Sequence, residues 1–294
     1  TPGHAAFAKM RSRGARVTDL VILLVAADDG VKPQTKEAIQ HIKEAKVPFL
    51  VAINKIDLPE ANVERVKSQL AENEVYVEGY GGDVVCVPIS AKKKQNLDQL
   101  LEMVLLVAEM QELKADPKGD LEAVVIEAKL DPKQGPITTL LVKNGRLKIG
   151  QTVWAETVEG KVRVLMNDAR DKVDEAVPGQ PVVMVGFKAV PAIGAKISSQ
   201  CLASNELVKS KDKTTEGEEK KTKLKFIIKA DVAGSLEAIR ANMSDEVEII
   251  DAGVGEVGEA DVLLAQATGA KIIAFNVSTI KTAARLAETE EISI

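Results

Sequence analysis

The chain has few aromatic residues and no excess of positive charge. Phe, Trp and Tyr make up 3% of its 294 residues, and the formal net charge at pH 7 is −5. Proteins that hold RNA across an extended surface usually combine a basic face with aromatic side chains that stack on bases. The composition gives no sign of such a surface, and we expect no DNA partner.

Cysteines and long apolar runs are also scarce. The two cysteines, Cys86 and Cys201, have no metal-ligand cluster beside them, so we expect isolated thiols in a reducing compartment. The longest apolar run, residues 20–27, is far shorter than the roughly 20 residues that cross a bilayer. No signal peptide is visible. These features predict a cytoplasmic protein without a membrane partner.

The most informative motif is Asn54-Lys55-Ile56-Asp57, which follows the apolar run of residues 49–53. A buried strand there would deliver the motif to the carboxyl edge of a parallel sheet, where α/β proteins bind ligands. The Asp57 carboxylate can accept hydrogen bonds from the N1–H and the 2-amino group of guanine. Adenine offers neither donor, and polar sites discriminate by about ten-thousand-fold in this way because an unpaired carboxylate is costly.

The other residues of this motif have less specific roles. The stem of Lys55 can lie along the face of the base, and the Asn54 side chain can brace neighbouring loops. A polar turn in which Asp57 caps a helix explains the motif equally well.

A second polar motif, Ser90-Ala91-Lys92, follows the β-rich run of residues 84–89 and begins 36 residues after Asn54. That spacing fits one helix and one strand, so both motifs are predicted at the same edge of the sheet. The backbone N–H groups of Ser90 and Ala91 can then reach O6 of guanine, and the stem of Lys92 can cover the other face of the base. Ser90 can also cap the helix that follows it.

The chain opens with T-P-G-H, upstream of the strand predicted at residues 20–27. Gly3 can bring its backbone N–H close to a γ-phosphate. His4 can orient a water for attack on that phosphate, since phosphoryl transfer depends on positioning and electrostatics. An ordinary surface histidine explains His4 as well. A structural turn before a helix explains all of residues 26–35, A-A-D-D-G-V-K-P-Q-T.

In this order, the segments T-P-G-H-x-A-F, D-G-V-x-P-Q-T, N-K-I-D and S-A-K resemble the bacterial-type translation initiation factor 2 family, a branch of the translational GTPases. The resemblance extends through nearly the whole chain. One departure is Ala5, where the family usually places a glutamate, so that acid cannot hold the adjacent loop here. The resemblance implies a guanine pocket formed by Asn54, Lys55, Asp57, Ser90, Ala91 and Lys92.

The resemblance also implies a reaction and partners. GTP would be hydrolysed to GDP and phosphate on the ribosome when the subunits join, with Gly3 at the γ-phosphate and His4 positioning the water. Mg²⁺ would be the required ion, with its protein ligands expected upstream of Thr1. Initiator tRNA would be a further partner, and the domain that binds it should follow Ile294.

A phosphate-binding loop of the form G-x-x-x-x-G-K-[S/T] is absent from the sequence. The chain also begins without Met and ends in the apolar stretch Ile292-Ser293-Ile294, which has the pattern of a strand at its start. A naturally degenerate GTPase-like protein would explain the missing loop, whereas a partial sequence explains both ends. We expect a fragment that lacks the phosphate loop and the C-terminal domain and is inactive on its own.

Three folded units are predicted, which gives a multidomain α/β plus β protein. Residues 1–115 alternate apolar strands with helices, the last at residues 97–113, and indicate a partial GTPase domain on a parallel sheet. Residues 120–207 contain short β-rich runs separated by Gly and Pro turns, which indicate a β-barrel. Its strands are expected at residues 123–129, 138–143, 152–156, 161–165 and 182–187.

The remaining residues form a charged linker (208–223) and a second small α/β domain (224–294) that is truncated at its C-terminus. Residues 253–258, G-V-G-E-V-G, fit the glycine pattern of dinucleotide-binding proteins. The next strand ends without the acid that would bind a ribose, and Glu256 would repel a pyrophosphate. We expect these glycines to form a turn that lets a helix approach the sheet.

Two other functions remain open. An elongation factor of the Tu type would carry a second barrel where this chain has its predicted second α/β unit, which argues against that class. A nonenzymatic ribosome-binding or scaffold protein would have no phosphate loop in its natural sequence.

Overall fold

The computed structural model describes residues 7–201, 224–244 and 246–294. The chain divides into two compact units, Thr1–Lys114 and Ala115–Ile294. The first unit ends one residue before the predicted boundary, whereas the barrel and the second α/β region fall in one unit. The predicted linker at residues 208–223 and the candidate residues Gly3 and His4 lie outside the described residues.

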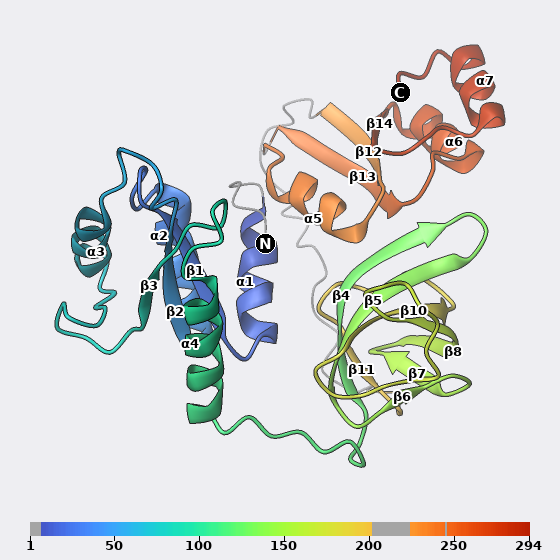
Figure 1. Cartoon of the computed structure of the whole chain (residues 1–294). Coiled ribbons are helices and arrows are strands. Elements are labelled where there is room, and N and C mark those ends of the chain that lie inside the picture. Colours follow the sequence, from blue (N-terminus) through green and yellow to red (C-terminus); the bar gives the residue numbers. More distant parts are fainter. Residues whose placement is uncertain (1–6, 202–223, 245) are drawn as a thin grey trace, which may run out of the picture. The chain divides into compact units, whose positions relative to one another are not determined.

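The first unit is an α/β layer built on a parallel sheet with the strand order β1-β2-β3 (Figure 1). All three strands expected from the sequence are present. The register places Ala26 opposite Asn54 and Ile53 opposite Pro88, so the carboxyl ends of the strands lie at one edge. The elements are α1 (Ala8–Val17), β1 (Val21–Ala26), α2 (Pro33–Ala45), β2 (Phe49–Asn54), α3 (Val63–Glu72), β3 (Cys86–Pro88) and α4 (Leu97–Met110).

Side chains alternate between the two faces of this sheet, as the two-residue period of a strand requires. Leu23 and Val25 of β1, with Val51 and Ile53 of β2, belong to a core that includes α2 and α3. On the other face, α4 packs against β2 and β3. Leu24 of β1 is 58% exposed on that face.

Helix α4 ends at Met110, three residues before the predicted end at 113, and Glu112 just beyond it has a left-handed backbone (φ 45°). The helix carries more apolar surface than the sheet covers, because Leu101, Leu105 and Met110 are all more than half exposed. An amphipathic helix usually buries its apolar stripe. Part of this stripe is therefore available for further packing.

The second unit begins with a closed barrel in the order β10-β5-β4-β11-β7-β8, which confirms the predicted barrel (Figure 1). The sequence does not predict three short strands, β6, β9 and β11. Each has two or three residues, too few to show a period-two pattern. The strands are β4 (Glu122–Asp131), β5 (Gly135–Asn144), β6 (Leu147–Lys148), β7 (Thr152–Ala155), β8 (Val158–Met166), β9 (Glu175–Ala176), β10 (Pro181–Phe187) and β11 (Lys196–Ser198).

Two glycines let β8 and β10 approach closely at a β-bulge. Gly186 has φ 143°, and a Cβ there would lie 1.9 Å from the carbonyl oxygen of Lys161. A Cβ on Gly160 would lie 2.6 Å from the ring of Phe187, which is buried in the barrel core. The pairing register shifts between Val185 and Phe187. The shape of the barrel wall here depends on the absence of two side chains.

The rest of the second unit contains the predicted small α/β layer, with a parallel sheet in the order β13-β12-β14. Apolar residues of β12, β14, α6 and α7 form its core. Its elements are β12 (Leu224–Ala230), α5 (Ala233–Ala241), β13 (Val247–Val254), α6 (Glu259–Thr268), β14 (Lys271–Phe275) and α7 (Lys281–Thr289).

The glycine-rich segment that begins at the end of β13 accommodates an ion pair. Lys229 Nζ lies 2.8 Å from Asp261 Oδ1, and the two side chains are only 16% and 12% exposed. A Cβ on Gly253 would lie 3.0 Å from this ammonium group. Asp261 also accepts a hydrogen bond from the Gly258 N–H at the start of α6 (2.9 Å). Gly255 and Gly258 thus lie in a turn before α6, as expected, whereas Gly253 is still in β13, and its missing side chain leaves space for the paired Lys229 of β12.

None of the helices in the described residues is long and apolar enough to cross a membrane.

Within the described residues, no group of three or more His, Cys, Asp or Glu side chains is placed to hold a metal ion. Cys86 and Cys201 are free thiols. Burial raises the pKa of Cys86 to about 11, so this thiol stays protonated at neutral pH.

Gly186→Ala tests the close approach of β8 and β10. The new methyl group would meet the Lys161 carbonyl in a strained backbone, so we expect the free energy of unfolding to fall by about 3 kcal/mol or more. The measurement is urea unfolding followed by fluorescence of Trp154, the single tryptophan, in β7.

Gly179→Ala is the matched control. Gly179 has φ 83° with no atom within 4 Å of its Cβ position, so this variant should lose only the roughly 1–2 kcal/mol of a left-handed backbone. Equal losses in the two variants would show that the contact with Lys161 costs nothing.

Candidate functional site

Three loops meet at the carboxyl edge of the first sheet, one after each strand. Backbone hydrogen bonds connect neighbouring loops: the Ala27 N–H donates to the Asn54 carbonyl (2.8 Å), and the Ile56 N–H donates to the Ile89 carbonyl (3.3 Å). The acidic turn after β1, N-K-I-D after β2 and S-A-K after β3 therefore lie next to one another. This edge is where parallel α/β sheets bind ligands.

Asn54 connects the second loop to the third. Its Oδ1 accepts a hydrogen bond from the Ala91 N–H (3.0 Å). Ala91 N–H is also the group expected at O6 of guanine, so in this geometry it already has a protein acceptor. The bond fixes the two loops relative to each other.

Ser90 holds the carboxylate of Asp57. The serine is fully buried, and its Oγ donates to Asp57 Oδ1 (2.7 Å) while accepting from the Lys93 N–H (3.1 Å). The hydroxyl bond, opposed by desolvation and helped by the ammonium groups of Lys93 and Lys92, keeps the pKa of Asp57 below its ordinary value. Asp57 is therefore ionised at neutral pH, and an ionised carboxylate has about four lone-pair sites to offer.

The backbone N–H of Ser90 has a different partner from the one expected. It donates to the Gln95 carbonyl (3.1 Å), and the Gln95 N–H donates back to the Ser90 carbonyl (3.0 Å). These two bonds close the loop after β3. In this geometry Ser90 contacts Asp57 through its hydroxyl, while its N–H is bonded within the loop, and a contact of that N–H with a base stays a prediction. Lys92 is exposed on the same loop.

Lys55 is held by the acidic turn after β1. It has a left-handed backbone (φ 66°), and its Nζ lies 2.9 Å from Asp28 Oδ2 and 3.5 Å from Asp29 Oδ2. The hydrogen bond with Asp28 raises the pKa of Lys55, and the same bond lowers the pKa of Asp28. The sequence predicts only a turn at these acids. The signal for their contact is two adjacent acids at the end of the strand beside N-K-I-D.

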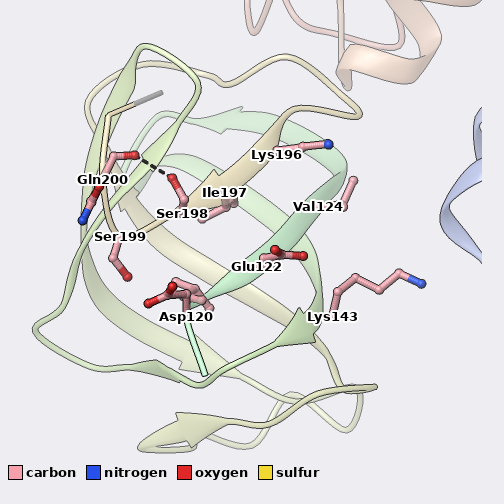
Figure 2. Close-up of a pocket in the computed structure, with 11 residues that line it drawn as sticks. Asp120, Glu122, Val124, Lys143, Lys196, Ile197, Ser198, Ser199 and Gln200 are labelled. Atoms are coloured by element: carbon pink, nitrogen blue, oxygen red, sulfur yellow. Dashed lines mark hydrogen bonds between the residues drawn. The ribbon is translucent and has the colours of Figure 1, made fainter. Parts of the chain in front are cut away.

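A separate hollow of about 380 Å³ lies on the barrel, where β4 begins and β11 ends (Figure 2). Its lining mixes acids, Asp120 and Glu122, with the lysines Lys143 and Lys196, and the lysines extend away from the side that Gln200 occupies (Figure 2). The lining contains no glycine loop that could cradle a phosphate.

Three protein families match successive parts of the chain. Residues 1–110 match the elongation factor Tu GTP binding domain, residues 120–200 match elongation factor G domain 2, and residues 199–294 match translation-initiation factor 2. The first two matches fall on the parallel sheet unit and on the barrel.

Similar proteins span the whole chain. Translation initiation factor IF-2 of Halothermothrix orenii is 46% identical over 100% of this chain and 47% of its own length. That of Thermoanaerobacter sp. is 45% identical over 100% of this chain and 46% of its own. The chain thus spans just under half the length of these relatives. The crystal structure of GDP-bound aIF5B from Aeropyrum pernix is similar over 100% of this chain and 59% of its own, with 25% identity and a TM-score of 0.58.

A GTP-binding domain followed by a domain-2 barrel is common to the translational GTPases, and the fold and the sheet-edge loops place this chain in that class. The branches of the class differ in the domain after the barrel. In this chain that domain is a parallel α/β layer that matches translation-initiation factor 2, and the full-length relatives carry the same name. The chain belongs to the translation initiation factor 2 family.

Ser90→Ala tests the bond that holds Asp57. Loss of the hydroxyl removes the largest cause of the lowered pKa, so the pKa of Asp57 should rise toward its ordinary value. Because a carboxylate with a depressed folded-state pKa adds stability that is lost as pH falls through that pKa, the acid limb of unfolding should become shallower. The unpaired Lys93 N–H should cost about 1–2 kcal/mol at neutral pH.

The measurement is an NMR titration of the Asp57 carboxyl carbon. Lys93→Ala is the control, because it keeps the hydroxyl bond and removes only a weaker charge effect, so its shift should be smaller. A larger shift in Lys93→Ala than in Ser90→Ala would contradict the assigned cause.

Proposed function

We propose that the intact protein binds GTP and hydrolyses it to GDP and phosphate on the ribosome during translation initiation, in the cytoplasm. The observation that carries this proposal is the ionised carboxylate of Asp57, held by Ser90 at the carboxyl edge of the sheet, next to the Asn54–Ala91 bond. The family matches support the same reaction and setting.

In this proposal guanine is recognised by the acceptor positions of the Asp57 carboxylate that Ser90 does not use. Oδ1 takes the Ser90 hydroxyl, and the remaining lone pairs can accept the N1–H and the 2-amino group of guanine. The stems of Lys55 and Lys92 flank the base in this proposal. Asn54 keeps the loops of these two lysines at a fixed spacing through Ala91.

Hydrolysis is assigned to the segment before α1. We place the Gly3 N–H at the γ-phosphate and assign to His4 the positioning of the attacking water, on the strength of the family motif alone. The described residues hold no acidic cluster that fits Mg²⁺. No residue of this chain is assigned to that ion, and no step here passes through it.

The exposed apolar residues of the first unit support a larger GTPase domain in the intact protein. Among the described strands, β1 pairs only with β2, and Leu24 is 58% exposed beside this open edge. Leu105 and Met110 of α4 are 65% and 73% exposed. Burial of each such side chain stabilises a fold by about 1.5–3 kcal/mol. We infer that the part of the protein that carries the phosphate loop covers these residues.

Initiation is favoured over elongation by the region after the barrel. Its parallel sheet β13-β12-β14 differs from the second barrel of elongation factors of the Tu type. The ribosome and initiator tRNA are proposed as partners by family membership, and the tRNA-binding domain is expected beyond Ile294. A nonenzymatic scaffold protein would bind no guanine nucleotide in its intact form.

In the intact protein, Asp57→Asn should lower the preference for GTP over ATP by about two orders of magnitude or more. The amide presents a donor where the base needs an acceptor, and buried polar mismatches carry penalties of this size. Competition binding with the two nucleotides measures it. Asp98→Asn, an exposed carboxylate in the first turn of α4, is the control. An unchanged preference in Asp57→Asn would remove Asp57 from the site.

His4→Ala should lower ribosome-stimulated hydrolysis by about 100-fold or more while the Kd for GTP changes little, because misplacing a reacting group, here the attacking water, costs about this much in rate. Single-turnover hydrolysis and equilibrium binding measure the two quantities. His41→Ala is the control, since His41 is the other histidine of the chain and contacts Glu37 on α2 (3.3 Å). Equal losses of rate and affinity would show that His4 is structural.

A further inference from the structure

The ion pair between Lys55 and the acidic turn joins two of the three loops at the proposed guanine site. Asp28 contacts the Lys55 ammonium with both oxygens, at 3.2 Å and 2.9 Å. The Asp28 side chain is 20% exposed and that of Lys55 is 43% exposed. The pair therefore lies at the rim of the sheet edge, partly shielded from water.

Asp29 is the weaker partner. Its Oδ2 lies 3.5 Å from Lys55 Nζ, and its Oδ1 lies 3.2 Å from Lys32 Nζ. Its side chain is 51% exposed. Of the two acids, Asp28 is the one whose geometry fixes the position of the ammonium group.

The turn that carries Asp28 is itself fastened to α3. Arg65 Nη2 donates to the Asp28 carbonyl (2.6 Å), and Gln69 Oε1 accepts from the Val31 N–H (2.9 Å). Gly30 has φ 77°, and a Cβ there would lie 2.3 Å from Gln69 Oε1. The carboxylate of Asp28 is thus presented from a backbone held at both sides.

Lysine is a flexible anchor by itself, because its ammonium group sits on a four-carbon stem with many rotamers. A stem that must lie along a base loses that freedom when the base binds, and a side chain already held in place loses less. In this structure the backbone of Lys55 is fixed in the left-handed region and its ammonium is fixed by Asp28. Both ends of the stem are constrained before any ligand arrives.

We infer that Asp28 is a positioning residue for guanine-nucleotide binding, which acts by holding the Lys55 ammonium so that the stem is ready as one wall of the base site. The inference rests on the proposed guanine site and adds a residue to it. Asp28 contributes to how tightly a nucleotide is held, whereas Asp57 determines which base is chosen. Because Asp28 acts through Lys55, its effect depends on the presence of that ammonium group.

The test uses the full-length protein and a fluorescent GDP analogue, with Kd from titration and the dissociation rate from displacement by unlabelled GDP. Asp28→Ala should weaken binding by about tenfold, mostly through faster dissociation, because the stem must be ordered on binding. Asp28→Asn, which keeps acceptor oxygen but loses the charge, should fall between wild type and Asp28→Ala. The preference for GTP over ATP should not change in either variant.

A double-mutant cycle separates positioning from a merely structural role. In a Lys55→Met background, which keeps an unbranched stem without the ammonium, Asp28→Ala should cause no further loss of affinity. Glu74→Gln, which removes the surface partner of Lys43 (2.8 Å), controls for the loss of an ion pair elsewhere in the unit. Urea unfolding of each variant checks that the fold is kept.

The outcomes distinguish this inference from the proposed function. Two results would overturn the positioning role of Asp28: an unchanged affinity in Asp28→Ala, or the same loss of affinity with and without the Lys55 ammonium. In either case, GDP binding by the wild-type protein would still support the guanine site. A wild-type protein that binds no guanine nucleotide would overturn both. A loss confined to the background with Lys55 intact supports the inference.

Discussion

The parallel pairing of β1, β2 and β3 is the constraint on which the site depends. Parallel strands send all their carboxyl ends to one edge, so loops distant in sequence become neighbours. With Ala26 opposite Asn54 and Ile53 opposite Pro88, the acidic turn, N-K-I-D and S-A-K come within hydrogen-bonding distance. Residues Leu50 to Ile53 of β2 are fully buried on both faces. If β1 slipped by one residue along β2, each of its side chains would move to the opposite face of the sheet. Its buried residues would then leave the core, and this cost fixes the register.

Two anchors of different character shape the edge. The Ser90 hydroxyl is buried and bonds to the carboxylate of Asp57, so water does not compete with it. The Asp28–Lys55 pair is partly exposed, and ion pairs of that kind add little to stability. The pair matters because it fixes the position of the long Lys55 side chain. In the proposed guanine site, the Ser90 bond holds Asp57 as an acceptor, and the Asp28 pair restrains the side chain of Lys55.

The sequence predicts the strands and the loops of the site well, because both leave local patterns. The apolar run before Asn54 and the polar residues after it mark a buried strand and a ligand edge. The contact between Asp28 and Lys55 leaves only one weak signal, the two adjacent acids at the end of β1, since 27 positions separate the two residues. The role of Ser90 is predictable only in part, because the same residue offers an N–H and a hydroxyl, and the Gln95 carbonyl decides which is used.

Other differences between prediction and structure have similar causes. β11 has three residues with one buried side chain, so neither length nor period marks it as a strand. The glycine pattern that begins at the end of β13 matches a cofactor motif, yet Gly253 is next to the ammonium of Lys229. That lysine lies on another strand, β12, and the contact becomes apparent only when the strands are paired. Local patterns thus predict elements, and side-chain contacts between elements require the fold.

The bonds that shape this edge come from the three loops and from α3, where Arg65 and Gln69 hold the acidic turn. Asp57 lies near the positive charges of Lys92 and Lys93, and Lys55 is paired with Asp28 and Asp29, so each charge proposed to face the base has a protein partner beforehand. Such an edge requires no phosphate loop in order to form. If the guanine site lies here, as we propose, the residues that choose the base are already held in place by bonds within this unit.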